Sequence, residues 1–196
     1  MEASPGSPRE VALFGTSADP PTRGHQVLLE GLLERFPRVA TWASENPMKQ
    51  HGAPLALRSS LLEALVRQIH NPRLQHLQQL SSPFAIDTLT RAQERWPGAE
   101  LVFVVGSDLA GQIPRWKQGA ALLQHCRLAI APRQDFPLQP EAKAALERLG
   151  ARLELLAFPV PGTASSQLRA APDPAQIPDG VWPLLLEHNL YGLTTT

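Results

Sequence analysis

A short stretch near the start of the chain combines small residues with side chains that can hold phosphate oxygens. It begins with Gly15, Thr16 and Ser17 and ends with Thr22 and His25. Small residues let backbone amides approach a ligand closely, and the unpaired N–H groups at the start of a following helix attract anions. Thr22 stands three residues before His25, where a helix N-cap would be, so both side chains would face the first helical turn. These residue types at this spacing indicate a phosphate site.

The same stretch has a plainer interpretation as a strand–turn–helix junction, with Thr22 as a helix cap and His25 in solvent. The two common phosphate-binding patterns, G-x-x-x-x-G-K-[ST] and G-x-G-x-x-G, are both absent from the chain. Residue types alone therefore leave the two interpretations open.

Alternating strand-like and helix-like segments surround this stretch and must position it. Apolar runs typical of buried strands cover residues 10–14, 38–42, 100–105, 127–131 and 152–158, with a weaker run at 74–80. Helical spacing covers residues 27–36, 54–69, 86–96, 117–124, 140–149 and 180–190. Such alternation is typical of an α/β fold with a mostly parallel sheet. Its ligand crevice lies beyond the carboxyl ends of the strands, so we expect the site on the loops after residues 14, 42, 105, 131 and 158.

Five segments in order along the chain resemble the motifs of one family. Residues 15–25 resemble the signature G-G-[ST]-F-D-P-x-[HT]-x-G-H of the HIGH-type nucleotidyltransferases. Four later segments resemble motifs of the nicotinate-nucleotide adenylyltransferases: Asn46-Pro47-Met48-Lys49 with Arg58, Asp87-Thr88-Leu89, Gly106-Ser107-Asp108-Leu109 with Ile113-Pro114-Arg115-Trp116, and Ala164-Ser165-Ser166-Gln167-Leu168-Arg169. The matches span residues 11–169 and are most like the cyanobacterial branch. The resemblance implies a Rossmann-like, doubly wound sheet with helices on both faces.

The resemblance also implies a reaction, in which AMP moves from ATP to nicotinate mononucleotide and gives deamido-NAD and pyrophosphate in NAD biosynthesis. The residues that it implies in catalysis are His25, Thr22, Lys49 and Arg169. Those that it implies in ATP binding are Gly15, Thr16, Ser17, Gly106, Asp108, Ser165 and Ser166. Mg²⁺ would arrive with ATP and be held mainly by phosphates and water, and we expect no metal site made by the protein itself.

The acceptor nucleotide would contact Thr88, Arg115 and Trp116, with Trp116 stacking beside the pyridine ring. The other tryptophans, Trp42, Trp96 and Trp182, are expected to be packing residues. Two of the implied residues have plainer interpretations. Lys49 would be a solvated loop lysine if its loop points away, and Asp108 would be a helix cap.

Departures from the family pattern keep other functions open. Thr16 replaces the second glycine of the signature, Ala18 replaces its phenylalanine, and Thr22 stands where many relatives have histidine. A related adenylyltransferase for phosphopantetheine also carries threonine at that last position. The alternatives are therefore a phosphopantetheine adenylyltransferase, a nicotinamide-mononucleotide adenylyltransferase, or a nucleotide-binding relative without catalysis. Trp116 in its Pro-Arg-Trp context argues against the first of these.

Composition narrows the class of protein. Hydrophobic residues make up 43% and charged residues 18%, as in ordinary globular proteins. A formal net charge of zero gives no broad basic face for nucleic acid, and no apolar run is long enough to cross a membrane. The single cysteine, Cys126, excludes an internal disulfide and is expected to be a small buried hydrophobe.

These observations predict a cytoplasmic protein that binds neither nucleic acid nor membrane. Residues 1–10 lack the apolar core of a signal peptide. We expect a flexible tail over residues 1–9 and one nucleotidyltransferase domain over residues 10–193. The oligomeric state stays open, with a homo-oligomer as one option, and so does the choice between an acid and an amide mononucleotide.

Overall fold

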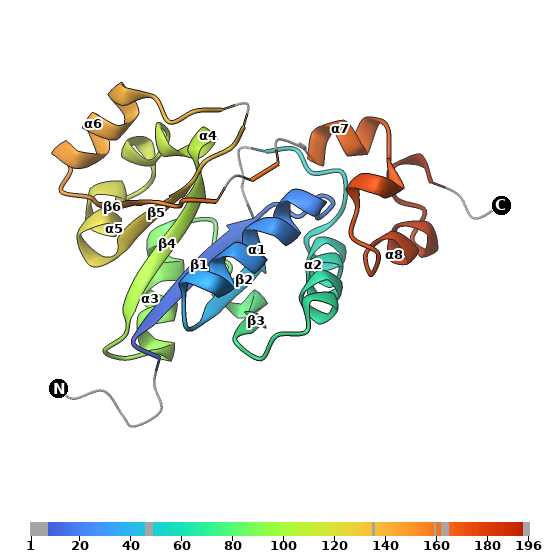
Figure 1. Cartoon of the computed structure of the whole chain (residues 1–196), viewed down its shortest axis with the longest axis horizontal. Helices are drawn as coiled ribbons and strands as arrows, with labels where there is room; N and C mark the ends of the chain where they lie inside the picture. Colours follow the sequence, from blue (N-terminus) through green and yellow to red (C-terminus); the bar gives the residue numbers. More distant parts are fainter. Residues whose placement is uncertain (1–7, 46–48, 135, 159, 162–164, 194–196) are drawn as a thin grey trace.

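The computed structural model describes residues 8–45, 49–134, 136–158, 160–161 and 165–193, and its centre is a six-stranded parallel sheet (Figure 1). The strands are β1 (Glu10–Thr16), β2 (Val39–Ala43), β3 (Leu74–His76), β4 (Glu100–Gly106), β5 (Arg127–Ala131) and β6 (Arg152–Leu155). Their order is β3-β2-β1-β4-β5-β6, and neighbouring strands are parallel throughout. The prediction of a Rossmann-like, doubly wound α/β fold is confirmed.

Helices cover both faces of this sheet (Figure 1). The helices in the described part of the chain are α1 (Arg23–Arg35), α2 (Leu55–Ile69), α3 (Ala85–Arg95), α4 (Ser107–Ala110), α5 (Gly119–His125), α6 (Pro140–Arg148), α7 (Ser165–Ala170) and α8 (Trp182–Glu187). Short 3₁₀ turns lie at η1 (Gln78–Leu80), η2 (Ile113–Arg115), η3 (Pro174–Gln176) and η4 (Leu190–Gly192). None of the helices in the described part of the chain has the length and apolarity that crossing a bilayer requires.

The central strand β1 divides the interior into two apolar cores. Ala12 and Phe14 pack on one face with α1, α2 and α8, whereas Val11 and Leu13 pack on the other with α3, α5 and α6. Successive side chains of a strand point to opposite faces, so a strand covered on both sides appears in the sequence as one continuous apolar run. Cys126 is fully buried in the second core, as predicted.

Three predicted elements end earlier than expected. β6 stops at Leu155, not at Phe158, because the chain leaves the sheet and the Phe158 ring lies against Gly31 of α1. The last helix occupies Trp182–Glu187, not 180–190, because Asn189 takes a left-handed backbone conformation (φ 48°) that a helix cannot continue through. The weak strand predicted at 74–80 forms only over Leu74–His76 and gives way to the turn η1.

The order of the strands reverses between β1 and β4, which lie side by side. From β1 the chain moves outward through α1 to β2, and from β4 it moves the other way toward β5. The loops after these two strands therefore part, and a crevice opens between them. The candidate site predicted from the sequence lies around this crevice.

Candidate active site

A cleft of about 980 Å³ opens at the carboxyl ends of β1 and β4. Its wall includes every residue for which the sequence predicted a catalytic or binding role, namely Gly15, Thr16, Ser17, Thr22, His25, Lys49, Thr88, Gly106, Asp108, Arg115, Trp116, Ser165, Ser166 and Arg169. These side chains come from loops that are far apart in the sequence, so the fold is what brings them into one space.

The first turn of α1 forms one end of the cleft. Thr22 is its N-cap residue, and the Thr22 backbone N–H donates to Nδ1 of His25 at 3.0 Å. Since a backbone N–H can only donate, Nδ1 is the unprotonated ring nitrogen and Nε2 carries the proton. Nε2 lies 2.8 Å from Oγ1 of Thr16. The threonine pair therefore fixes both the tautomer and the orientation of the imidazole.

The imidazole of His25 is held in its neutral form. Burial, and secondly the positive charge of Arg133, lowers its pKa from 6.5 to about 4. A neutral imidazole has one N–H, so His25 can act at neutral pH as a hydrogen-bond donor through Nε2 but not as a cation.

We predict that His25 stays neutral until the pH approaches about 4, below the usual midpoint of 6.5. Because the pKa is lower in the folded than in the unfolded chain, acid favours unfolding. The free energy of unfolding contributed by this group should fall as the pH drops from 6.5 to about 4 and then level off. An NMR titration of the His25 ring resonances measures the midpoint directly, and a midpoint near 6.5 would contradict the burial.

The carboxylate of Asp19 ties the phosphate stretch to two distant segments, and it was not among the predicted site residues. Asp19 is 1% exposed. Its Oδ2 accepts from the Gly52 N–H at 2.7 Å, and its Oδ1 accepts from the Ala53 N–H at 3.2 Å and the Tyr191 hydroxyl at 2.7 Å. The first two partners sit in the loop that carries Lys49, and the third lies near the carboxyl end of the chain.

Helix α7 is fastened to the same stretch. Arg169 donates from Nη1 to the backbone oxygen of Asp19 at 2.8 Å, and Ser165 donates from Oγ to the backbone oxygen of Pro20 at 2.9 Å. Gly52 leaves room for this arrangement, since a Cβ there would lie 2.6 Å from Cδ of Arg169. Arg169 and the Ser165 hydroxyl are thus held at the end of the cleft that the first turn of α1 forms.

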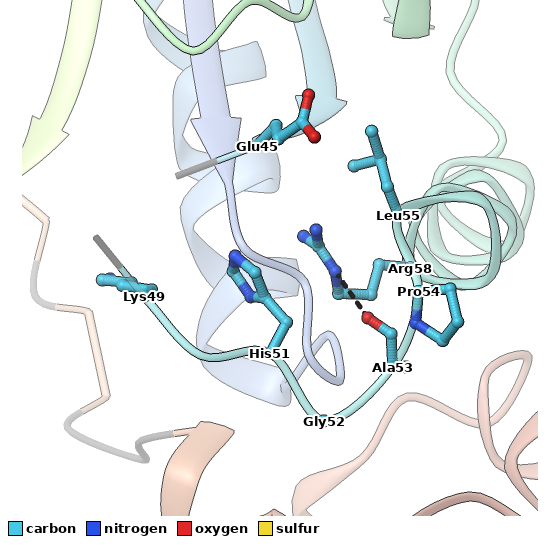
Figure 2. Close-up of a pocket in the computed structure, with 8 residues that line it drawn as sticks. All are labelled: Glu45, Lys49, His51, Gly52, Ala53, Pro54, Leu55 and Arg58. Carbon is cyan, nitrogen blue, oxygen red and sulfur yellow. Dashed lines mark hydrogen bonds between the residues drawn. The ribbon is translucent and has the colours of Figure 1, made fainter. Parts of the chain in front are cut away.

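Arg58 is buried, with 2% of its surface exposed, and connects several loops near the cleft. Its Nη1 donates to the backbone oxygens of Ser17 at 2.7 Å and Ser44 at 2.9 Å, and its Nε donates to that of Ala53 at 3.1 Å. Figure 2 shows this guanidinium beside a smaller pocket of about 520 Å³, whose wall also includes Lys49. One side chain therefore sets the relative positions of three loops.

Lys49 is exposed and lines both the cleft and the smaller pocket. Its loop therefore does not point away from the site, which was the condition for the plainer interpretation. The other members of its motif, Asn46, Pro47 and Met48, lie outside the described residues, and so does Ala164 of the last motif.

The opposite wall of the phosphate end carries an ion pair that the sequence did not reveal. Arg133, just after β5, donates from Nη1 to Oδ2 of Asp108 at 3.1 Å. Asp108 lies inside the first turn of α4, whose N-cap is Gly106, so it is not the helix cap of the plainer interpretation. The sequence could have indicated Arg133 only through its position, because this residue follows the carboxyl end of a predicted strand.

Aromatic rings form the far end of the cleft. Trp116 is partly exposed to the cleft and meets Phe103 edge to face, with ring centroids 6.4 Å apart. Thr88 is buried close to the start of α3. The Nζ of Lys117 lies 4.0 Å from the centroid of the Phe84 ring, and both residues line the cleft. This end therefore combines flat apolar surface with positive charge.

The remaining tryptophans pack in the interior, as predicted. Trp42 and Trp96 are 2% and 7% exposed, and Trp182 packs against the first core. Trp42 has a further role, because its indole lies so close to Gly15 that a Cβ there would come within 2.7 Å of it. A glycine at position 15 is thus required by packing against Trp42.

The acidic side chains of the cleft do not form a metal cage. Among the described residues, no group of three or more His, Cys, Asp or Glu side chains is arranged to hold a metal ion. Glu45 and Asp108 both line the cleft, and Asp108 already faces Arg133. A divalent cation would fit this site as part of a nucleotide, with phosphate oxygens as its main ligands.

A family model and the curated relatives agree on the family of this chain. The family model described as Cytidylyltransferase-like matches residues 13–171. A probable nicotinate-nucleotide adenylyltransferase from Synechocystis is 35% identical over 93% of this chain and 98% of its own length. One from Chlorobaculum tepidum is 32% identical over 92% of this chain and 98% of its own length.

Solved structures agree in fold. The nicotinic acid mononucleotide adenylyltransferase of Plasmodium falciparum, complexed with NaAD, superimposes with a TM-score of 0.75 at 17% identity over 95% of this chain and 98% of that one. A putative nicotinate-nucleotide adenylyltransferase from Vibrio parahaemolyticus gives a TM-score of 0.66 at 18% identity, over 93% of this chain and 95% of that one. At these identities the likeness shows the shared α/β architecture.

Proposed function

This chain belongs to the cytidylyltransferase-like family and, within it, to the nicotinate-nucleotide adenylyltransferases, and we propose that it accordingly transfers AMP from ATP to nicotinate mononucleotide. The observation that carries the proposal is that one cleft has two ends of different chemistry. One end offers hydrogen-bond donors and cations for phosphates, and the other offers an aromatic wall for a pyridine ring.

The reaction needs little covalent catalysis by the protein. A phosphate oxygen of nicotinate mononucleotide attacks the α-phosphorus of ATP, and the bond from that phosphorus to the bridging oxygen breaks. The products are deamido-NAD and pyrophosphate. Because the nucleophile is already an anion, no general base is needed, and catalysis consists of positioning and stabilising charge at the α-phosphorus. Donors and cations suit this task better than a nucleophilic side chain does.

The phosphate end supplies these groups from separate elements. His25 and Thr22, with the amides of Gly15, Thr16 and Ser17, would line the α- and β-phosphates at the start of α1. Ser165, Ser166 and Arg169 would hold the outer phosphates, with Arg169 as a fork-shaped donor. Lys49 would add a mobile cation, and Gly106 and Asp108 would meet the ribose hydroxyls.

Arg133 joins this set as a residue that the sequence did not reveal. Its guanidinium lies at the phosphate end, on the cleft wall and near His25, and it pairs with Asp108. In this position Arg133 would place positive charge against the triphosphate and hold Asp108 for the ribose.

Positive charge at the acceptor end supports an acid acceptor over an amide. Arg115 and Lys117 flank Trp116 on the cleft wall, while Thr88 lies close by. Nicotinate mononucleotide carries a carboxylate where the nicotinamide nucleotide carries a neutral amide, so these cations favour the acid. Stacking on Trp116 would hold the pyridine ring itself.

Mg²⁺ belongs to the proposal as part of the substrate, bound to the phosphates of ATP and to water. It would neutralise the pyrophosphate as that group leaves. The proposed setting is the cytoplasm, where a cysteine such as the buried Cys126 stays reduced.

The test is pyrophosphate release from ATP with three acceptors offered in turn: nicotinate mononucleotide, nicotinamide mononucleotide and phosphopantetheine. We expect the highest kcat/KM with nicotinate mononucleotide. A preference for phosphopantetheine would instead establish the first alternative function. Release with none of the three would leave a nucleotide-binding relative without catalysis.

We predict that Trp116→Ala raises the KM for nicotinate mononucleotide about 10-fold, the scale of losing one stacked ring, while the KM for ATP stays near the wild-type value. Trp116→Phe is the matched control, because it keeps a flat ring at the same place and should lose much less. Steady-state kinetics with each substrate varied in turn measures both constants. An equal rise in the two KM values would contradict the stacking role.

A further inference from the structure

The side chains of Thr16 and His25 are in contact and both line the cleft. Thr16 is the last residue of β1 and lines the cleft. Its Oγ1 is 2.8 Å from Nε2 of His25 and 3.4 Å from the backbone N of Ala18. Glycine occupies this position in the family signature, so the hydroxyl is a departure from that signature.

The direction of each hydrogen bond follows from the backbone. Nδ1 of His25 accepts from the Thr22 N–H, so the imidazole proton is on Nε2. Nε2 therefore donates to Thr16, and the Ala18 N–H can only donate to it as well. Both contacts use the lone pairs of the hydroxyl oxygen. The hydroxyl's own proton remains to be donated, and no acceptor for it is found among the residues that the structure describes.

We propose that the Thr16 hydroxyl is the terminal donor of a relay, in which Nε2–H of His25 donates to Thr16 and Thr16 donates to a phosphate oxygen of bound ATP. The inference rests on the proposed function. It gives the departure from glycine a chemical role at the site, beyond the backbone amide that the sequence assigned to this residue.

Such a relay would polarise the Thr16 hydroxyl and hold the His25 imidazole in one orientation. A hydroxyl that accepts from an N–H becomes a stronger donor, because successive hydrogen bonds in a chain reinforce one another. The imidazole is held from both sides, by Thr22 at Nδ1 and by Thr16 at Nε2. The neutral state of His25, with its pKa near 4, leaves Nδ1 able to accept from the Thr22 N–H at physiological pH.

The test compares Thr16→Val with Thr16→Ser in the full chain. Valine keeps the branched shape and suits a strand, but it lacks the hydroxyl, whereas serine keeps it. We expect kcat/KM for ATP to fall about 10- to 100-fold in the valine variant, the scale of a lost hydrogen bond to a charged acceptor. The serine variant should stay close to the wild type, and the KM for nicotinate mononucleotide should stay unchanged in both.

A second readout needs no activity. In the ligand-free protein the Nε2–H of His25 should give a hydrogen-bonded NMR resonance in the wild type and in Thr16→Ser, and this resonance should shift or vanish in Thr16→Val. An unchanged resonance in the valine variant would overturn the positioning of His25, and an unchanged kcat/KM would overturn the contact with phosphate. Absence of pyrophosphate release by the wild type would instead count against the proposed function, while the resonance still tests Thr16.

Discussion

Replacing His25 by alanine is expected to lower kcat by about 100-fold or more, the scale of disabling one donor that faces charge developing in the transition state. The neutral imidazole supplies the only N–H of its ring, through Nε2, at the phosphate end of the cleft. That N–H polarises and orients the Thr16 hydroxyl, which would donate to the phosphate, so the substitution disables this donor. Initial rates of pyrophosphate release with saturating ATP and nicotinate mononucleotide measure the effect.

A matched control for this variant is His125→Ala. His125 is exposed in the last turn of α5 and is not on the cleft wall. Its replacement should leave kcat unchanged. If His25→Ala also turned over at the wild-type rate, His25 would have no place in the mechanism.

Replacing Asp19 by alanine is expected to lower the free energy of unfolding by about 3 kcal/mol or more, as breaking a buried charged network does. The substitution leaves the Gly52 and Ala53 amides and the Tyr191 hydroxyl without their acceptor, and buried donors without partners are costly. Because the same carboxylate lies 3.6 Å from Nη1 of Arg169, turnover should fall with stability. Urea unfolding followed by circular dichroism gives the free energy.

Asp179→Asn serves as the comparison for Asp19. Asp179 pairs with Arg23 at 2.6 Å, but its side chain is 84% exposed, and exposed ion pairs contribute little. The free energy of unfolding of the Asp179→Asn variant should stay within about 1 kcal/mol of the wild-type value. A similarly small change in Asp19→Ala would show that the buried carboxylate is not the link between the three segments.

Much of this arrangement was predictable because its signals are local. The apolar strands indicated a parallel sheet, and the turn into α1 placed Thr22 and His25 together through helical spacing. Distant residues such as Arg169 were assigned to the same site through the resemblance to family motifs, and the parallel sheet, which sends its loops to one edge, explains why they meet Thr16 there.

The contacts that hold the site together were not predictable in the same way. Asp19 meets Tyr191 across 172 positions of sequence, and Arg58 reaches Ser17 across 41. No periodicity or spacing connects such pairs, because they are set by how α2 and the carboxyl-terminal segment pack on the sheet. The bond between Thr16 and His25 depends in the same way on the orientation of a ring, which residue types do not report.

In the proposed reaction the adenylyl group of ATP is what moves. The most direct measurement follows ATP labelled either at the α-phosphate or at the γ-phosphate during reaction with nicotinate mononucleotide. We predict that the α-label appears in deamido-NAD and the γ-label in pyrophosphate, in equal amounts. Transfer of the γ-label to the acceptor, or no transfer of either label, would contradict the account.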